Sequence, residues 1–254
     1  MSYPEHPLST RAIVKPGLWA VLPEGGLVNN VIPAIKGCRV SIVASPKMGA
    51  SFVQYIITAQ KDGHTAFPLA SEEGVESFIY VVSGSAKVKA GEHAYDLTAG
   101  GYMFAPAEYG VDFTAEDGTK LLFYKQKYIP LAGTKAHIVT GNVNEMKYAV
   151  YEGMDNVGIK DLLPTDDLGF DMNMHILKFK LGASHGYIET HVQEHGMYFL
   201  SGKGMYRVDD EWIPVKAGDY MFLDAYCPQA CYAVGREEDF AYIYSKDCNR
   251  DVVL

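Results

Sequence analysis

The feature that most constrains the fold of this chain is an internal repeat. Residues 82–107 align without a gap with residues 200–225, at a constant offset of 118 positions. In both segments a Ser-Gly pair is followed by an Ala-Gly pair and then by Tyr-Met-Phe. Self-similarity at a fixed spacing is typical of a chain built from copies of one structural unit. We therefore expect two tandem domains rather than one large domain.

Each copy contains short apolar or alternating segments that are separated by turn residues, which is the pattern of β-strands. Such segments cover residues 78–82, 102–104, 121–124, 198–200, 220–223 and 240–244. The chain is rich in aromatic residues that favour strands, with 18 Tyr and 11 Phe, and long amphipathic helical patterns are scarce. The sequence therefore predicts an all-β fold of the sandwich or barrel type.

A turn-rich stretch, residues 129–147, is the natural connector between the two copies. We place an N-terminal arm at residues 1–45, the first copy at residues 46–135 and the second copy at residues 136–254. Apolar residues recur in the arm, so we expect it to pack over the two copies.

Composition and charge narrow the possible partners. The 254-residue chain has a formal net charge of −9, which argues against binding to nucleic acid or to an anionic membrane surface. The sequence opens without a basic and apolar leader, and no run approaches the roughly 18 apolar residues of a membrane span, so we expect a cytoplasmic location. We interpret the four cysteines as reduced, packed thiols. The expected partners are a small molecule and further copies of the chain in a homo-oligomer.

One segment of the second copy groups three residues that can bind a metal. Glu189, His191 and His195 form the pattern E-x-H-x3-H between apolar, strand-like flanks. In an extended chain Glu189 and His191 project from the same face, where two imidazoles and a carboxylate can bind a divalent cation. The ordinary alternative is a set of polar surface side chains on a strand.

The first copy serves as an internal control on this segment. The offset of 118 leads from the three candidate ligands to Ser71, Glu73 and Ser77, so the first copy lacks the same set. Because that copy keeps the turns and loses the ligands, we interpret the ligand set as functional rather than structural.

The second copy resembles the cupin superfamily, whose motifs are G-x5-H-x-H-x3,4-E-x6-G and P-G-x5-P-x-G-x2-H-x3-N. This chain departs from that pattern, because it has Glu189, His191 and His195 in the order E, H, H. It also has Gln229 where the second motif normally supplies a histidine. The resemblance implies a double-stranded β-helix, or jelly-roll, for each copy. The expected fold is then two tandem cupin barrels with an N-terminal arm.

The permuted ligand order is similar to that of the (S)-ureidoglycine aminohydrolases, bicupins of allantoin degradation in purine metabolism. The resemblance covers nearly the whole chain, including residues 10–16, 171–195 and 244–250. It implies one Mn2+ ion, in the second barrel only, with the metal ligands Glu189, His191, His195 and Gln229. It implies substrate contacts from Glu189, Gln229, Tyr206, Tyr242 and Lys246. Glu189 and Lys246 are the expected catalytic residues of a hydrolase that acts on a C–N bond in a linear amidine, releasing ammonia from (S)-ureidoglycine to give (S)-ureidoglycolate.

The residue types suit this chemistry, and they leave alternatives open. Two imidazoles, a carboxylate and an amide oxygen favour Mn2+ or Fe2+ over Zn2+. Lys246 shares a strand face with Tyr242 and can pair with a substrate carboxylate, although an exposed Lys and a core Tyr are the ordinary alternatives. An Fe(II) cupin dioxygenase and a non-catalytic small-ligand-binding bicupin are the competing functions. Whether Cys227 approaches the metal stays open, and Glu194 is expected to face away from it.

Overall fold

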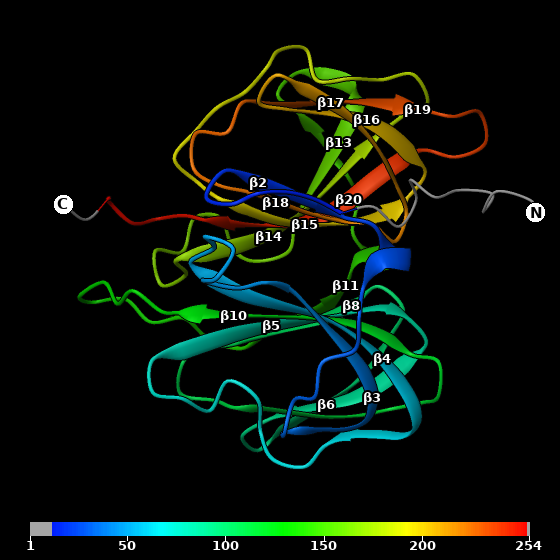
Figure 1. The fold of residues 1–254 in the computed structure, drawn as a ribbon. Helices are drawn as coiled ribbons and strands as arrows, with labels where there is room; N and C mark the ends of the chain where they lie inside the picture. Colours follow the sequence, from blue (N-terminus) through cyan, green and yellow to red (C-terminus); the bar gives the residue numbers. More distant parts are fainter. Residues whose placement is uncertain (1–11, 253–254) are drawn as a thin grey trace, which may run out of the picture.

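The computed structural model describes residues 12–252, and in this range the chain is almost entirely β-structure (Figure 1). Its regular elements within these residues are twenty strands and two short 3₁₀ segments, Glu24–Gly26 and Val143–Glu145. Residues 1–11 and 253–254 lie outside the described residues, and with them the beginning of the predicted arm. The predicted all-β fold class is confirmed. No helix among residues 12–252 is long and apolar enough to cross a membrane.

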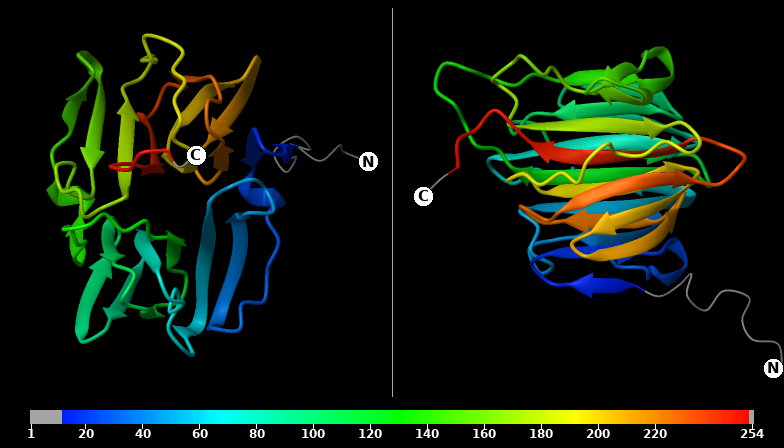
Figure 2. Two further views of the ribbon diagram at one scale, coloured as in Figure 1. Left: turned by 90° about the vertical axis from the view of Figure 1, so that its left-hand side faces the viewer. Right: turned by 90° about the horizontal axis from the view of Figure 1, so that it is seen from above.

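The strands form two stacked bodies, as Figure 1 and Figure 2 show from three sides. The lower body of Figure 1 is a nine-stranded antiparallel sheet that curls on itself, in the order β11-β8-β5-β10-β4-β9-β6-β7, with β3 paired to β4. Its strands are β3 (Ile35–Ala44), β4 (Phe52–Thr65), β5 (Val75–Ser83), β6 (Ser85–Ala90), β7 (His93–Thr98), β8 (Gly101–Ala105), β9 (Val111–Ala115), β10 (Lys120–Lys127) and β11 (Val139–Asn142).

The upper body has an eight-stranded sheet in the order β1-β2-β18-β15-β20-β14-β13-β12 and a three-stranded sheet in the order β17-β16-β19. The strands of the larger sheet are β1 (Ile13–Lys15), β2 (Trp19–Leu22), β12 (Ala149–Tyr151), β13 (Met154–Asp161), β14 (Met172–Phe179), β15 (His195–Ser201), β18 (Tyr220–Leu223) and β20 (Phe240–Asp247). The smaller sheet consists of β16 (Lys203–Val208), β17 (Glu211–Lys216) and β19 (Gln229–Val234). Apolar side chains of both sheets pack together as the interior of this barrel.

Segments at the edges of the two copies contribute strands to both bodies. In the predicted arm, β1 and β2 extend the upper body, where Val21 lies opposite Met221 of β18. The last strand of the arm, β3, pairs with β4 of the lower body. The predicted connector supplies β11, which returns to the lower body with Val139 opposite Phe104 of β8. The division into residues 1–45, 46–135 and 136–254 stays a prediction.

The Tyr-Met-Phe motif shared by the two copies explains how the bodies meet. In β18, Tyr220 and Phe222 belong to a core that both bodies share, whereas Met221 points into the interior of the upper barrel. In β8, Tyr102 and Phe104 join the same shared core, and the intervening Met faces the interior of the lower barrel. Successive side chains of a strand lie on opposite faces, so a strand buried on both faces is apolar throughout. The most closely repeated residues are thus those that pack the copies together.

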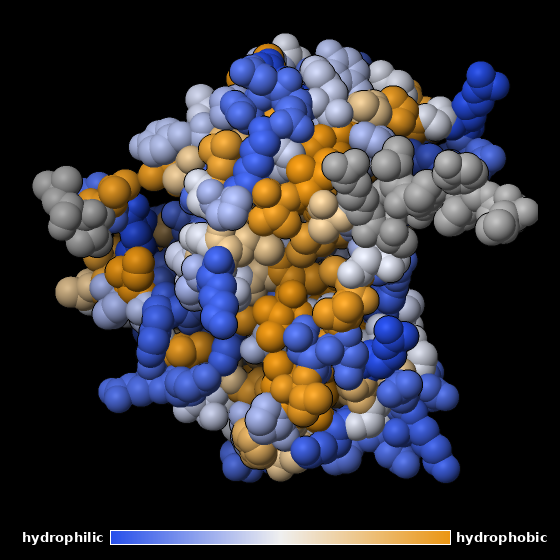
Figure 3. Space-filling model, viewed as in Figure 1, coloured by the Kyte–Doolittle hydropathy of each residue, from blue (hydrophilic) through white to orange (hydrophobic). Residues whose placement is uncertain are grey.

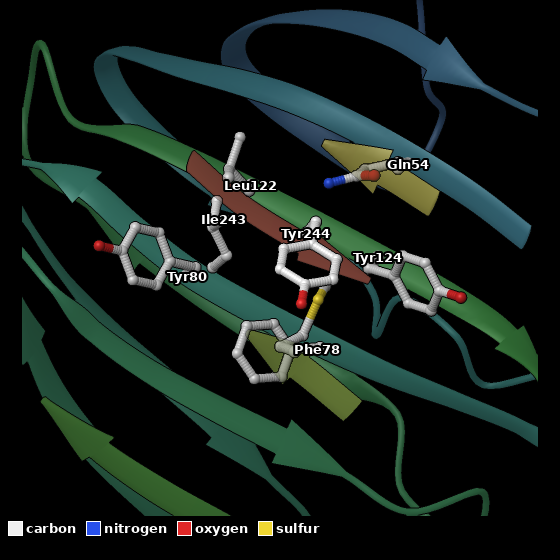
Figure 4. Close-up of a pocket in the computed structure, with 9 residues that line it drawn as sticks. Gln54, Phe78, Tyr80, Leu122, Tyr124, Ile243 and Tyr244 are labelled. Atoms are coloured by element: carbon white, nitrogen blue, oxygen red, sulfur yellow. The ribbon is translucent and has the colours of Figure 1, made fainter. Parts of the chain in front are cut away.

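Figure 4 shows part of this shared core, in a small cavity between the bodies. Its labelled side chains come from β4, β5 and β10 of the lower body and from β20 of the upper body: Gln54, Phe78, Tyr80, Leu122, Tyr124, Ile243 and Tyr244. One polar contact crosses the core, because the Tyr220 hydroxyl donates to Oε1 of Gln54 at 2.8 Å. Gly196 makes this approach possible, since a Cβ atom there would lie 2.3 Å from Oε1 of Gln54.

A second polar link between the bodies involves Glu194. Its carboxylate accepts hydrogen bonds from the backbone N–H of Ser51, at 2.9 Å, and from the Ser51 hydroxyl. Glu194 therefore points toward the lower body, and the prediction that it faces away from the candidate ligands is confirmed.

The surface of the molecule carries an apolar band. In the space-filling view of Figure 3, apolar side chains run from the upper body to the lower one, between hydrophilic flanks. Contiguous apolar surface is the kind that subunit contacts use. The homo-oligomer expected from the sequence stays a prediction.

Candidate active site

A small pocket lies within the upper barrel. All seven side chains that the sequence predicted for metal or substrate binding line it, namely Glu189, His191, His195, Tyr206, Gln229, Tyr242 and Lys246. Its other lining residues are Tyr151, Leu177, Met197 and Tyr244. The seven predicted residues span 57 positions of the sequence, and the fold brings them together in one pocket. The individual role of each residue stays a prediction.

Two of the predicted ligands lie directly opposite each other. Glu189 and Gln229 form an isolated antiparallel bridge, with backbone N–H···O bonds of 2.9 Å in both directions. The rest of the segment is not a strand, because His191 lies in the loop before β15 and His195 is the first residue of β15. The extended chain expected through Glu189 and His191 is therefore interrupted by a loop before His195. The loop is held differently, by the backbone N–H of Tyr226, which donates to the His191 carbonyl oxygen at 2.7 Å.

Backbone carbonyl groups hold both imidazoles in one tautomer. Nδ1 of His191 lies 3.0 Å from the carbonyl oxygen of Gln193, and Nδ1 of His195 lies 2.7 Å from that of Ser245. A carbonyl oxygen can only accept, so each Nδ1 carries the proton and each Nε2 presents a lone pair. Burial lowers the pKa of both rings, to about 3 for His195, so both are neutral at pH 7. This is the usual state of metal-binding histidines.

The arrangement of the donor atoms fits a divalent cation. The Nε2 atoms of His191 and His195 face each other at 3.2 Å, and Nε2 of His191 lies 3.3 Å from the side-chain amide of Gln229. Two lone pairs at this distance repel each other unless a positive charge lies between them. Two nitrogens bound side by side to one ion, at about 2.1 Å each, are themselves about 3 Å apart. The Gln229 amide can turn its oxygen to the same point, because its two ends are exchanged by rotation.

Glu189 supplies the carboxylate of the predicted set and stands off from the imidazoles. Its Oε1 lies 3.7 Å from Nε2 of His185, and its Oε2 lies 3.5 Å from the Tyr151 hydroxyl. Within residues 12–252 no three His, Cys, Asp or Glu side chains come close enough together to form a metal cluster. Burial raises the pKa of Glu189, and the Lys246 ammonium opposes this effect. A carboxyl group in this setting can bind a cation and can also exchange a proton.

Two tyrosines support Gln229 from inside the barrel. The Tyr206 hydroxyl donates to Oε1 of Gln229 at 3.0 Å and lies 3.4 Å from the hydroxyl of Tyr242. When the amide turns its oxygen toward the imidazoles, its NH2 group donates to the same Tyr206 hydroxyl. Burial raises the pKa of both hydroxyls, so both keep their protons. Lys246 lines the same pocket and is only partly buried, which leaves its ammonium group free to meet an anionic ligand.

The lower barrel repeats the backbone geometry of the site without its side chains. Leu69 and Val111 form an isolated bridge, with bonds of 2.8 Å in both directions, that matches the bridge between Glu189 and Gln229. The prediction that Ser71 corresponds to Glu189 was wrong, because the bridge residue Leu69 lies eight positions before Ser77, whereas Glu189 lies six positions before His195, the residue aligned with Ser77. An apolar pair cannot bind a cation, and both of its members belong to the core of the lower barrel.

Two aromatic residues that line the pocket were not identified by the sequence analysis. Tyr244 lies between Tyr242 and Lys246 on the same face of β20, so strand periodicity could have identified it. Tyr151 is the last residue of the short strand β12, which forms a hairpin with β13, and no sequence motif marks it. Cys227, whose role was left open, is not among the lining residues, and burial raises the pKa of its thiol to about 11. A buried thiol with a raised pKa is unreactive.

Two stacked β-barrels, one of which encloses a cluster of two imidazoles and an amide, define a two-domain cupin. The family described as Cupin domain matches residues 175–244. The chain is 51% identical to the (S)-ureidoglycine aminohydrolase of Escherichia coli strain K12, over 99% of this chain and 97% of that protein. The chain therefore belongs to the (S)-ureidoglycine aminohydrolase family, and it is a hydrolase.

Two further comparisons show similarity along nearly the whole chain. The chain is 25% identical to the (S)-ureidoglycine aminohydrolase of Arabidopsis thaliana, over 95% of this chain and 79% of that protein. The crystal structure of protein Ylba from E. coli, which is 46% identical, superimposes with a TM-score of 0.89 over 100% of both chains. The resemblance inferred from the ligand order is confirmed.

Proposed function

We propose that this chain is a manganese-dependent enzyme that converts (S)-ureidoglycine and water into (S)-ureidoglycolate and ammonia. The observation that carries the proposal is the pair of neutral imidazoles whose Nε2 lone pairs face each other at 3.2 Å inside the pocket. The name of a relative with 51% identity along nearly the whole chain supports the same reaction.

Four side chains would hold the ion: Glu189, His191, His195 and Gln229. Bound Mn2+ supplies positive charge that orients the substrate and stabilises negative charge on its oxygen atoms. Oxygen donors make up half of this set, which favours manganese over zinc. The carbonyl anchors on both Nδ1 atoms keep the imidazoles aimed at the same point before the ion binds.

The reaction breaks the bond between the central carbon and its amino group and forms a bond between that carbon and the oxygen of water. Lys246 pairs with the substrate carboxylate, and Tyr206 and Tyr242 hold Gln229 in place. Glu189 accepts a proton from the attacking water and returns it to the departing amine, which leaves as ammonia. No oxidant or reductant is consumed.

The experiment combines metal analysis of the purified protein with an ammonia-release assay on freshly generated ureidoglycine. We expect a metal-free preparation to be inactive and Mn2+ to restore ammonia release in the absence of O2. A Glu189→Gln variant should bind Mn2+ more weakly and should lose turnover even when Mn2+ is in saturating excess. Dependence on O2 would instead support a cupin dioxygenase, and a protein that binds no metal would support a non-catalytic ligand-binding bicupin.

A further inference from the structure

His185 is a buried histidine that lies behind the pocket rather than in its lining. Its side chain is 0% exposed, and it packs against Phe179 and Tyr151, with ring centroids 5.0 Å and 6.2 Å away. Its Nε2 lies 3.7 Å from Oε1 of Glu189 and has no hydrogen-bond partner among residues 12–252. A buried ring nitrogen without a partner is costly, so its place beside a carboxylate needs an explanation.

The proton of the His185 ring is on the nitrogen that faces Glu189. The backbone N–H of Cys231 donates to Nδ1 of His185 at 3.0 Å. A backbone N–H can only donate, so Nδ1 presents its lone pair and Nε2 carries the hydrogen. This is the opposite tautomer to that of His191 and His195, whose Nδ1 atoms donate to carbonyl groups.

The lower barrel shows which part of this arrangement is structural. There, Thr65 occupies the position of His185, and its hydroxyl oxygen accepts the backbone N–H of Phe113, also at 3.0 Å. Phe113 is the counterpart of Cys231, since both lie two residues after the equivalent bridge residue in their strands. A threonine is therefore sufficient to bond this backbone N–H. The second nitrogen of His185 is an addition found in the barrel that also has Glu189.

The counterpart of Glu189 in the lower barrel is Leu69, which cannot accept a hydrogen bond. The ring N–H and the carboxylate are thus present together in one barrel and absent together from the other. A purely structural role for His185 explains its bond to Cys231 and leaves this joint occurrence without a reason.

We propose that His185 is a positioning residue for Glu189, whose carboxylate it orients through its Nε2–H toward the metal ion and the reacting proton. The proposal rests on the proposed function, because that function makes Glu189 a ligand. A shift of about 0.8 Å closes the 3.7 Å separation to an ordinary hydrogen-bond length. Partners that orient metal ligands in this way typically change metal affinity by roughly 10–100-fold when they are removed.

Two variants separate the positioning role from the structural one. His185→Asn keeps an acceptor near the place of Nδ1 and lacks the donor at Nε2. His185→Gln lacks the acceptor and keeps an N–H donor near the place of Nε2. Mn2+ affinity is measured by calorimetric titration of the metal-free proteins, and the melting temperature of each metal-free protein reports on the fold.

We expect His185→Asn to weaken Mn2+ binding by about tenfold or more while its melting temperature stays close to that of the wild type. His185→Gln should bind Mn2+ nearly as the wild type does and should melt at a lower temperature. A merely structural histidine predicts the opposite order of Mn2+ affinities. The proposal is wrong if the Asn variant keeps wild-type affinity or if both variants weaken binding equally.

A second comparison tests whether His185 acts through Glu189. In a Glu189→Gln background, His185→Asn should produce little further loss of Mn2+ affinity, because the carboxylate that it orients is already gone. Additive losses would contradict the proposal. A wild-type protein that binds Mn2+ but releases no ammonia would overturn the proposed reaction and leave the test of His185 valid, whereas a protein that binds no Mn2+ would overturn both.

Discussion

The hydrogen bond between Tyr220 and Gln54 should be measurable as an energetic coupling between the two bodies. Gln54→Leu removes the acceptor that the Tyr220 hydroxyl uses at 2.8 Å. The two residues are 0% and 2% exposed, so water cannot replace the lost bond. A buried hydroxyl left without a partner costs about 1–3 kcal/mol. A loss of about 2 kcal/mol in the free energy of unfolding lowers the melting temperature of a chain of this size by roughly 4–8 °C.

The control is Tyr220→Phe, alone and combined with Gln54→Leu. In the double variant neither the hydroxyl nor the amide is present, so no buried polar group lacks a partner. The double variant should therefore lose about 1–2 kcal/mol less unfolding free energy than the two single variants lose together. Urea unfolding of the four proteins, followed by circular dichroism, gives this coupling energy directly. A coupling below about 0.5 kcal/mol would refute the reasoning. So would two separate melting transitions, because the two bodies share one core.

Three other substitutions test different parts of the structure. Gly196→Ala places a methyl group 2.3 Å from Oε1 of Gln54, and this overpacking should cost about 1–3 kcal/mol in calorimetric unfolding; an unchanged melting temperature would mean that the bodies lie farther apart. Burial, and then the neighbouring Asp171, raise the pKa of Glu76 above its usual 4.5, so wild-type stability falls as pH rises above that value. The melting temperature of Glu76→Gln minus that of the wild type should therefore increase from pH 5 to pH 8. A difference that stays constant over this range would contradict the raised pKa. Lys246→Met removes a charge-assisted bond and should lower kcat/KM by about 10–100-fold without weakening Mn2+ binding; a loss below about threefold would exclude the pairing with a substrate carboxylate.

Local physics made parts of the fold predictable. The segment Tyr220–Leu223 was expected as a strand and forms β18 with the same bounds, because alternation and strand-forming residues are properties of the segment itself. In the same way, the shared strand face of Tyr242 and Lys246 correctly placed both in one pocket. The ligand residues were identifiable because few side-chain types bind divalent ions, and three of them lie within seven positions.

Long-range pairing was not predictable from the same patterns. Nothing within residues 13–22 specifies that β1 and β2 extend the upper body, because the choice depends on the free edge that β18 offers. The isolated bridge of Glu189 with Gln229 likewise depends on a partner 40 positions away, which is why the segment could be mistaken for a continuous strand. Tyr151 reaches the pocket only because β12 forms the end of the larger sheet.

The two barrels together separate what the fold requires from what the site adds. The same pair of backbone bonds joins Glu189 to Gln229 and Leu69 to Val111. One backbone N–H is bonded to a side chain in both barrels, to His185 in the upper one and to a threonine in the lower one. Because the lower barrel keeps this framework with an apolar pair, the framework does not depend on a bound ion. The candidate site is therefore a set of side-chain replacements on a backbone that packing and hydrogen bonding already determine, so its chemistry can be altered by substitution while the barrel persists.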